Sequence, residues 1–243
     1  MNDIGFIRNI FKPLKKTIVH PQWFSYKGEE ILIEWLRKIP MNSIVVDVGC
    51  ADRWAERHLT DTCRYIGLDY LETAATRYNS NVDIYATAMA LPFSENSVDV
   101  VILFDVLEHF NKCETAISEV VRVLKPGGLV LVQIPFLYPL HDSPYDYQRM
   151  TSFGLIDLIE RNGLSMDEFD YRGEPLETAA LLLNIALAKS VITFAGKNIL
   201  LKLFSYPLVG GAMILLNCFG WVCGKILPRD DFMPFSYHMI LKK

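Results

Sequence analysis

The strongest constraint on the fold is a set of four short apolar runs, rich in β-branched residues, at residues 44–48, 64–68, 98–104 and 129–134. Runs of this length and composition are typical of strands that are buried on both faces of a sheet. Helical patterns separate the runs, and this alternation predicts an α/β fold with a doubly wound, parallel sheet. Because ligands of such sheets bind beyond the carboxyl ends of the strands, the residues that follow each run are the candidates for chemistry.

Two segments have the pattern of helices that pack on this sheet. Apolar residues recur at the spacing of one helical face from Ile117 to Leu124, and Pro126 follows with two glycines that would end the helix. Thr151 is a candidate N-cap for a second helix, which would run to Arg161 and stop at the Asn-Gly pair that follows. Both helices would cover a face of the sheet.

Length and charge limit the class of protein. The chain has 243 residues, enough for one sizeable α/β domain with an insertion, and its net charge of -4 gives no footprint for nucleic acid. Five cysteines without a C-x-x-C pair indicate reduced thiols and a cytoplasmic protein. We predict three parts: a basic, aromatic N-terminal arm (1–40), a core domain (41–173 and 235–243) closed by a last strand, and an apolar helical insertion (174–234).

The residues after the first two runs suit a nucleoside ligand. Gly49 follows the first run, where a glycine lets the backbone approach a ligand closely. Asp69 ends the second run, 22 residues after Asp47 (69 minus 47), and a carboxylate there can accept hydrogen bonds from ribose hydroxyls. Taken alone, Asp69 could equally cap a helix. Asp52 stands where a helix should begin, and its charge would oppose a pyrophosphate, which argues against a dinucleotide.

Five segments in order resemble the class I S-adenosylmethionine-dependent methyltransferases. The family's motifs DxGCGxG, GLD, LPF…FDVV, LEH and LKPGG have their counterparts here between residues 40 and 172, as VVDVGCAD, YIGLD, ALPF…SVDVV, VLEHF and VLKPGG. The resemblance implies a Rossmann-like, seven-stranded, mostly parallel sheet with flanking helices, and S-adenosylmethionine as cofactor. No metal site is implied.

The resemblance also implies which residues hold the cofactor. They are Asp47, Gly49 and Ala51 for its methionine half; Asp69, Tyr70, Thr87, Ala88 and Met89 for its ribose and adenine; and Asp105 for its amino acid moiety or for the acceptor. The chain departs from the family pattern at three of its motif positions. Ala51 and Arg53 replace glycines, and Thr87 replaces an aspartate that contacts adenine. A hydroxyl makes weaker hydrogen bonds than a carboxylate, so these changes should affect affinity rather than the identity of the cofactor.

The polar segment 135–151 is the candidate acceptor site. It resembles a segment of a bacterial and archaeal subgroup associated with cell-surface glycan biosynthesis, which implies a hydroxyl of a sugar or a lipid-linked glycan precursor as acceptor. His141 is the leading candidate for the general base, since an imidazole titrates near physiological pH. Asp146 could orient it or act instead, and Arg149 could bind an anionic part of the substrate. The alternative is that these polar side chains only brace the loop.

Other functions stay open at this point. His109, beside Glu108, is interpreted as a packed or capping residue rather than a catalytic one. The departures at residues 51, 53 and 87 would also suit a non-catalytic module that binds S-adenosylmethionine. Methylation of carbon or nitrogen in a hydrophobic small molecule uses the same fold. An oxidoreductase is a further alternative, against which Asp52 and the missing glycines argue.

The apolar insertion raises the question of a membrane. Residues 203–224 are an uncharged stretch of 22 residues, long enough to span a bilayer. Residues 237–241 look like the closing strand, so both ends of the insertion should lie on one side. We favour helices that lie in the interface of the cytoplasmic membrane face, with help from the N-terminal arm. The alternatives are a soluble cap or homodimer face, and a hairpin through the bilayer, although Pro207 and several glycines weaken a simple helix.

Overall fold

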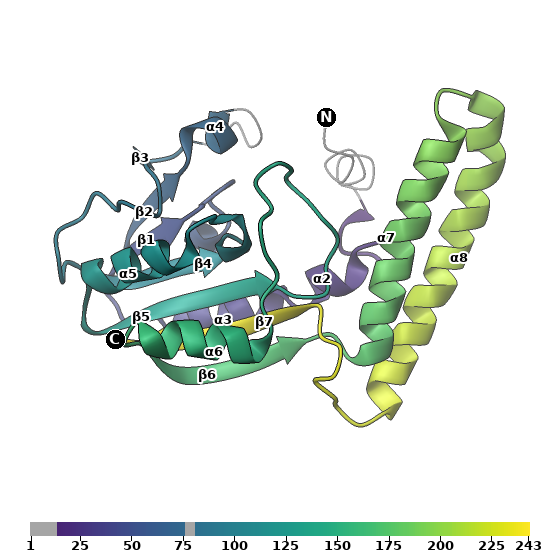
Figure 1. Ribbon diagram of the computed structural model, residues 1–243. Helices are drawn as coiled ribbons and strands as arrows, with labels where there is room; N and C mark the ends of the chain where they lie inside the picture. Colours follow the sequence, from purple (N-terminus) through teal and green to yellow (C-terminus); the bar gives the residue numbers. More distant parts are fainter. Residues whose placement is uncertain (1–13, 76–80) are drawn as a thin grey trace. The chain divides into compact units, whose positions relative to one another are not determined.

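The computed structural model describes residues 14–75 and 81–243 of the chain (Figure 1). Residues 1–13, about the first third of the predicted N-terminal arm, and residues 76–80 lie outside the described residues. The chain divides into two compact units. We call them the sheet unit (30–136, 145–170 and 237–243) and the hairpin unit (residues up to 29, 137–144 and 171–236).

The sheet has seven strands in the order β3-β2-β1-β4-β5-β7-β6. Their bounds are β1 Ile44–Val48, β2 Arg64–Asp69, β3 Ile84–Tyr85, β4 Val98–Phe104, β5 Leu124–Pro135, β6 Ser165–Arg172 and β7 Ser236–Lys242. Strands β1 to β5 pair with one another in parallel. Hydrogen bonds between Lys243 and residues 127 and 128 join the end of β7 to the start of β5, so β7 runs antiparallel. The predicted α/β, mostly parallel seven-stranded fold is confirmed.

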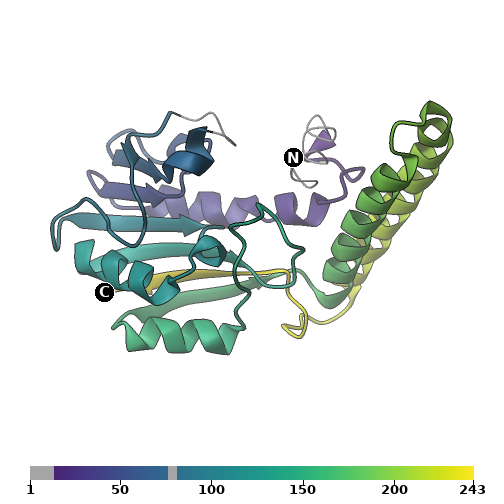
Figure 2. The same cartoon turned by 45° about the horizontal axis from the view of Figure 1, so that its top comes forward.

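Helices cover both faces of this sheet. Figures 1 and 2 show α5 (Cys113–Val123) and α6 (Ser152–Arg161) on one face and α3 (Glu29–Lys38) on the other. On the α3 face, Trp35 and Leu36 pack in one cluster with side chains of β1, β4, β5 and β7. Burying a large apolar side chain of this kind contributes about 1.5–3 kcal/mol. The strands are buried on both faces, which is why their sequences read as nearly continuous apolar runs.

The two predicted helices form close to their expected bounds. The Thr151 hydroxyl accepts a hydrogen bond from the Gly154 amide at 3.2 Å and caps α6, and Asn162 follows its last residue. Helix α5 ends at Val123, and β5 begins at Leu124, five residues earlier than the apolar run suggests. The Pro-Gly-Gly segment, which was predicted to end the helix, therefore lies inside the long strand.

The hairpin unit consists mainly of two long helices, α7 (Pro175–Ala195) and α8 (Ile199–Ile226), with the short α2 (Trp23–Lys27). The apolar helical insertion before the last strand is therefore confirmed. The expectation that Pro207 and the glycines interrupt the second apolar stretch was wrong, because α8 is one continuous helix of 28 residues. A proline inside a helix costs about 3 kcal/mol, and packing of α8 along α7 offsets this cost.

Candidate functional site

The turn after β1 has the backbone form that the predicted cofactor site requires. Gly49 has a φ of +76°, and a Cβ at this position would lie 2.6 Å from Cγ2 of Val106. Both the shape of the turn and the close approach of the segment that follows β4 therefore require glycine here. Ala51 also has a positive φ, of 44°, and its amide donates to Oδ2 of Asp69 at 3.1 Å. This hydrogen bond joins the first and second predicted motifs at the carboxyl ends of β1 and β2.

Asp69 is buried, and its carboxylate already accepts hydrogen bonds from several protein groups. Its Oδ1 accepts from the Tyr70 amide at 2.7 Å and from the Thr73 hydroxyl at 2.8 Å, in addition to the Ala51 bond on Oδ2. A carboxylate offers about four acceptor positions, so one position remains for a ribose hydroxyl. Asp69 is thus both a capping residue and a candidate ribose ligand, and its ribose role stays a prediction. Tyr70 beside it is half exposed, as a side chain next to adenine requires.

Arg53, which replaces the third glycine of the motif, fastens the turn to the neighbouring strands. It has a positive φ of 58°, unusual for a side chain of this size. Its guanidinium donates to Glu56 at 2.7 Å and to Asp83 at 2.9 Å, and stacks over the Tyr65 ring at 4.8 Å. These contacts offset the strain of the backbone. The residue that departs from the family pattern therefore stabilises the turn in another way.

Asp47 lies in β1 with its carboxyl buried. The Tyr65 hydroxyl donates to Oδ2 of Asp47 at 2.6 Å. Burial raises the pKa of Asp47 to about 7, although the Tyr65 hydrogen bond opposes this rise. A buried carboxyl that is close to ionisation at neutral pH gains from a nearby cation. The position therefore fits the ammonium group of the methionine half of the cofactor. Tyr65 was not predicted as a residue of the site. The sequence feature that could have indicated it is a tyrosine in β2, the strand that pairs with β1.

The residues predicted to border adenine form a turn at the end of β3. The Ala86 amide donates to the Asp69 carbonyl at 3.1 Å, which fixes this segment beside the end of β2. The Thr87 hydroxyl accepts from the Met89 amide at 3.3 Å. Ala88 is buried, so only its backbone could contact a ligand. The structure thus brings the predicted adenine and ribose residues to one edge of the sheet.

Asp105 follows β4 directly, at the same edge of the sheet. It has a φ of 51°, its amide donates to the Gln133 carbonyl at 2.9 Å, and its carboxylate accepts from the Gln133 side chain. The side chain is exposed. Asp105 is therefore positioned by β5 at the carboxyl end of β4, where the resemblance places it.

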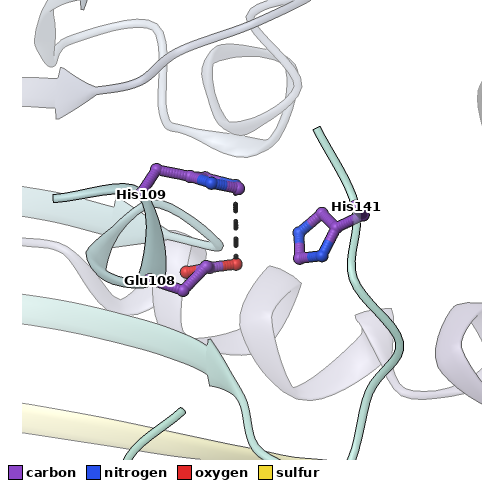
Figure 3. A group of neighbouring side chains, drawn as sticks. All are labelled: Glu108, His109 and His141. Carbon is purple, nitrogen blue, oxygen red and sulfur yellow. Dashed lines mark ion pairs between the residues drawn. The ribbon is translucent and has the colours of Figure 1, made fainter. Parts of the chain in front are cut away.

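Next to it, Glu108 and His109 form a pair (Figure 3). They lie in the 3-10 helix η4 (Leu107–His109), with Nε2 of His109 3.7 Å from Oε1 of the buried Glu108. The Nδ1 atom of His109 lies 2.8 Å from the carbonyl oxygen of Tyr145. Since a carbonyl only accepts, Nδ1 carries the proton and Nε2 is the nitrogen that can exchange one. The imidazole is thus oriented as a general base requires, while its catalytic role, like the packing role predicted from the sequence, stays a prediction.

The predicted acceptor residues fall into different parts of the chain. Arg149 donates to both carboxylate oxygens of Asp146, at 2.5 and 2.8 Å, and the Asp146 side chain is 2% exposed. This pair belongs to the sheet unit and supports the alternative in which these residues brace the loop. His141 belongs to the hairpin unit, where its ring packs edge-on against Tyr138 with centroids 5.4 Å apart. The catalytic roles of all three residues stay predictions.

Comparison with known proteins agrees with this geometry. Residues 46–132 match the family model of a methyltransferase domain. A probable S-adenosylmethionine-dependent methyltransferase of Mycolicibacterium smegmatis is 30% identical over 157 residues, 60% of this chain and 60% of that protein. A ubiquinone/menaquinone biosynthesis C-methyltransferase of Shewanella halifaxensis is 30% identical over 122 residues, 49% of this chain and 47% of that protein. The chain spans less than two thirds of the length of these curated relatives.

Solved structures share the fold at low sequence identity. A S-adenosylmethionine-dependent methyltransferase from Archaeoglobus fulgidus has a TM-score of 0.56 at 14% identity, covering 96% of this chain and 99% of its own. The cyclase SpnF has a TM-score of 0.55 at 15% identity, covering 99% and 94%. Likeness at this level shows the fold alone. The matched residues carry the strand ends that form the site described above, so residues 46–132 form a methyltransferase domain of the class I S-adenosylmethionine-dependent type.

Proposed function

We propose that the chain transfers a methyl group from S-adenosylmethionine to a hydroxyl of a sugar, carried on a lipid-linked glycan precursor. The observation that carries the reaction type is the orientation of His109, whose Nδ1–H donates to the Tyr145 carbonyl at 2.8 Å and leaves Nε2 to accept a proton. The sugar acceptor rests on the polar segment 135–151, which resembles a segment of a subgroup associated with cell-surface glycan biosynthesis.

The residues of the first two strand ends would hold the cofactor. The remaining acceptor position of Asp69 suits a ribose hydroxyl, and the buried Asp47 suits the ammonium group. When bound, S-adenosylmethionine supplies a methyl group on a sulfonium, which is reactive toward a nucleophile placed in line with the carbon–sulfur bond.

The protein's part in the transfer is to align the acceptor and remove its proton. With the methyl group supplied by the cofactor, Nε2 of His109 would accept the proton that the acceptor hydroxyl loses. Oε1 of the buried Glu108 lies 3.7 Å from this nitrogen. His141 is the second candidate for this role.

The proposal is tested with the purified chain and methyl-labelled S-adenosylmethionine. We expect label in a polyprenyl-diphosphate-linked or nucleotide-linked sugar, with a mass increase of one methyl group located on an oxygen. Quinones and acyl carrier protein esters belong in the same panel, because relatives named for these reactions match the chain. Label on a quinone carbon would replace the sugar proposal. Tight binding of S-adenosylhomocysteine without any turnover across the panel would favour a non-catalytic binding module.

A further inference from the structure

Helix α8 exposes a row of apolar side chains along its whole length. Six large residues on this row are between 57% and 76% exposed, and they are Leu200, Phe204, Leu208, Leu215, Phe219 and Ile226. They follow one another at intervals of four or seven residues, so they lie on one side of the helix. We call this row the outer face of α8. With about 1.5 Å of rise per residue, a helix of 28 residues is about 42 Å long.

The opposite side of α8 is already packed against α7. Met213 and Val209 contact Ala188 and Ile192 in an apolar cluster. Figures 1 and 2 both show the two helices side by side along their length. The hairpin is therefore held by one side of α8, and the outer face contributes nothing to it.

Polar contacts also hold the side of α8 that packs against α7. Asn184 and Asn217 are buried, and the amide of Asn184 donates to that of Asn217 at 2.8 Å between the helices. Asn217 in turn donates to the carbonyl oxygens of Ile18 and His20, at 2.7 and 3.2 Å. The segment before α2 thus packs on the hairpin about a third of the way along α8 from its C-terminal end.

The charges of the hairpin are all of one sign over its apolar part. From residue 178 to residue 227 there are four lysines, at positions 189, 197, 202 and 225, and no acid. Lys197, in the turn before α8, and Lys225, next to Ile226, are exposed near the two ends of the helix. Lysines beside an apolar face attract anionic lipid headgroups.

We propose that the outer face of α8 lies in the plane of a membrane surface rich in anionic lipid, with the lysines in the headgroup layer. Alone, α8 lacks the polar face that an interfacial helix needs. Packed on α7 it no longer needs one, because α7 covers the side that would otherwise face water.

The structure also weighs against passage through the bilayer. By length and composition, both α7 and α8 could cross a membrane. A crossing hairpin would, however, place Lys189 near the middle of the bilayer, where a lysine is costly. It would also draw the segment at Ile18 and His20, which Asn217 binds, toward the hydrocarbon. An in-plane hairpin avoids both costs and keeps its two ends on one side.

The first test is binding of the full chain to vesicles of phosphatidylcholine and phosphatidylglycerol, measured by sedimentation. We expect Leu208→Glu to lower the bound fraction at least about tenfold, with an unchanged helical circular dichroism spectrum. The control is Phe153→Glu, since Phe153 lies on α6 and is 80% exposed. It should leave binding unchanged. Wild-type binding by Leu208→Glu, or a lipid-free dimer that this change splits into monomers, would overturn the proposal.

The second test measures depth and separates the in-plane from the crossing arrangement. The partly exposed Cys63, Cys218 and Cys223 are first replaced by serine, which leaves only the buried Cys50 and Cys113. One labelling cysteine at a time is then introduced by Leu208→Cys, Leu215→Cys or Val222→Cys. Fluorophores at these positions should be quenched by lipids carrying a quencher near the headgroup, to the same extent at all three. The control Phe153→Cys on α6 should show little quenching. A depth that changes steadily from 208 to 222 would overturn the in-plane arrangement.

Discussion

At the scale of single residues, the candidate site depends on groups whose surroundings change their chemistry. Asp47 is the clearest case, because burial raises its pKa from 3.8 to about 7. The folded protein therefore holds this proton more tightly than the unfolded chain does. Stability from this group is present below the unfolded pKa and is lost as pH rises toward 7.

We therefore expect Asp47→Asn to flatten the pH dependence of unfolding. Between pH 4 and pH 7, the free energy of unfolding of the wild type should fall relative to the variant, by at most about 4 kcal/mol. Urea titrations of both proteins across this range measure the difference. If the two curves run parallel, the Asp47 carboxyl is ionised throughout and its pKa is not raised.

His109 is the residue on which the proposed chemistry depends most. His109→Ala should lower the turnover number by about 10²-fold or more, as expected for loss of a general base. The dissociation constant of S-adenosylhomocysteine, measured by calorimetry, should stay the same. His141→Ala is the comparison, and we expect it to cost less. The reverse order would return the role of base to His141, as the sequence analysis has it.

At the scale of elements, the turn between β1 and β2 shows how a departure from the family pattern is accommodated. Arg53 forms ion pairs with Glu56 and with Asp83, which follows β2. Arg57 forms an ion pair with Asp52, in the turn itself. The first arginine fixes the turn to the sheet, and the second makes an exposed local pair.

Arg53→Ala should therefore weaken cofactor binding, and Arg57→Ala should not. Exposed ion pairs contribute about 0.2–1 kcal/mol each, so we expect the dissociation constant of S-adenosylhomocysteine to rise about fivefold or more in the first variant. Calorimetry on both variants gives the comparison. Equal affinities would mean that the backbone of residues 49–53 holds its form without this arginine.

At the scale of the whole molecule, we expect an enzyme that stays at the cytoplasmic surface of a membrane while its sheet unit acts on an acceptor there. Raising the salt concentration from 0.1 M to 1 M shortens the Debye length from about 10 Å to about 3 Å. Attraction between the lysines and the headgroups should weaken, whereas the apolar contact of α8 should persist. Membrane fractions should therefore lose part of the protein in high salt and all of it in detergent. Complete release by salt alone would contradict apolar insertion.

Some of this protein was determined by local sequence alone. The buried strands β1, β2, β4 and β5, the Thr151 cap of α6 and the cofactor motifs could all be predicted, because each depends on residues close together in the chain. Strand β3, with two residues, and strand β6, with mostly exposed acidic and polar residues, could not. Their strand form comes from pairing with neighbours far away in sequence, which overrides weak local preference.

The tertiary structure decided what the polar and apolar residues do. Asp146 meets Arg149 rather than standing alone, and the Tyr145 carbonyl orients His109, because the loop after β5 returns to the end of β4. Likewise, the uncharged stretch with its proline and glycines lies in one continuous helix. Because α7 packs along this helix, one side of α8 is buried and the outer face is exposed. A helix that is apolar on every side has no hydrophobic periodicity to mark its packed face. Only the neighbouring helix then determines which side of it remains exposed.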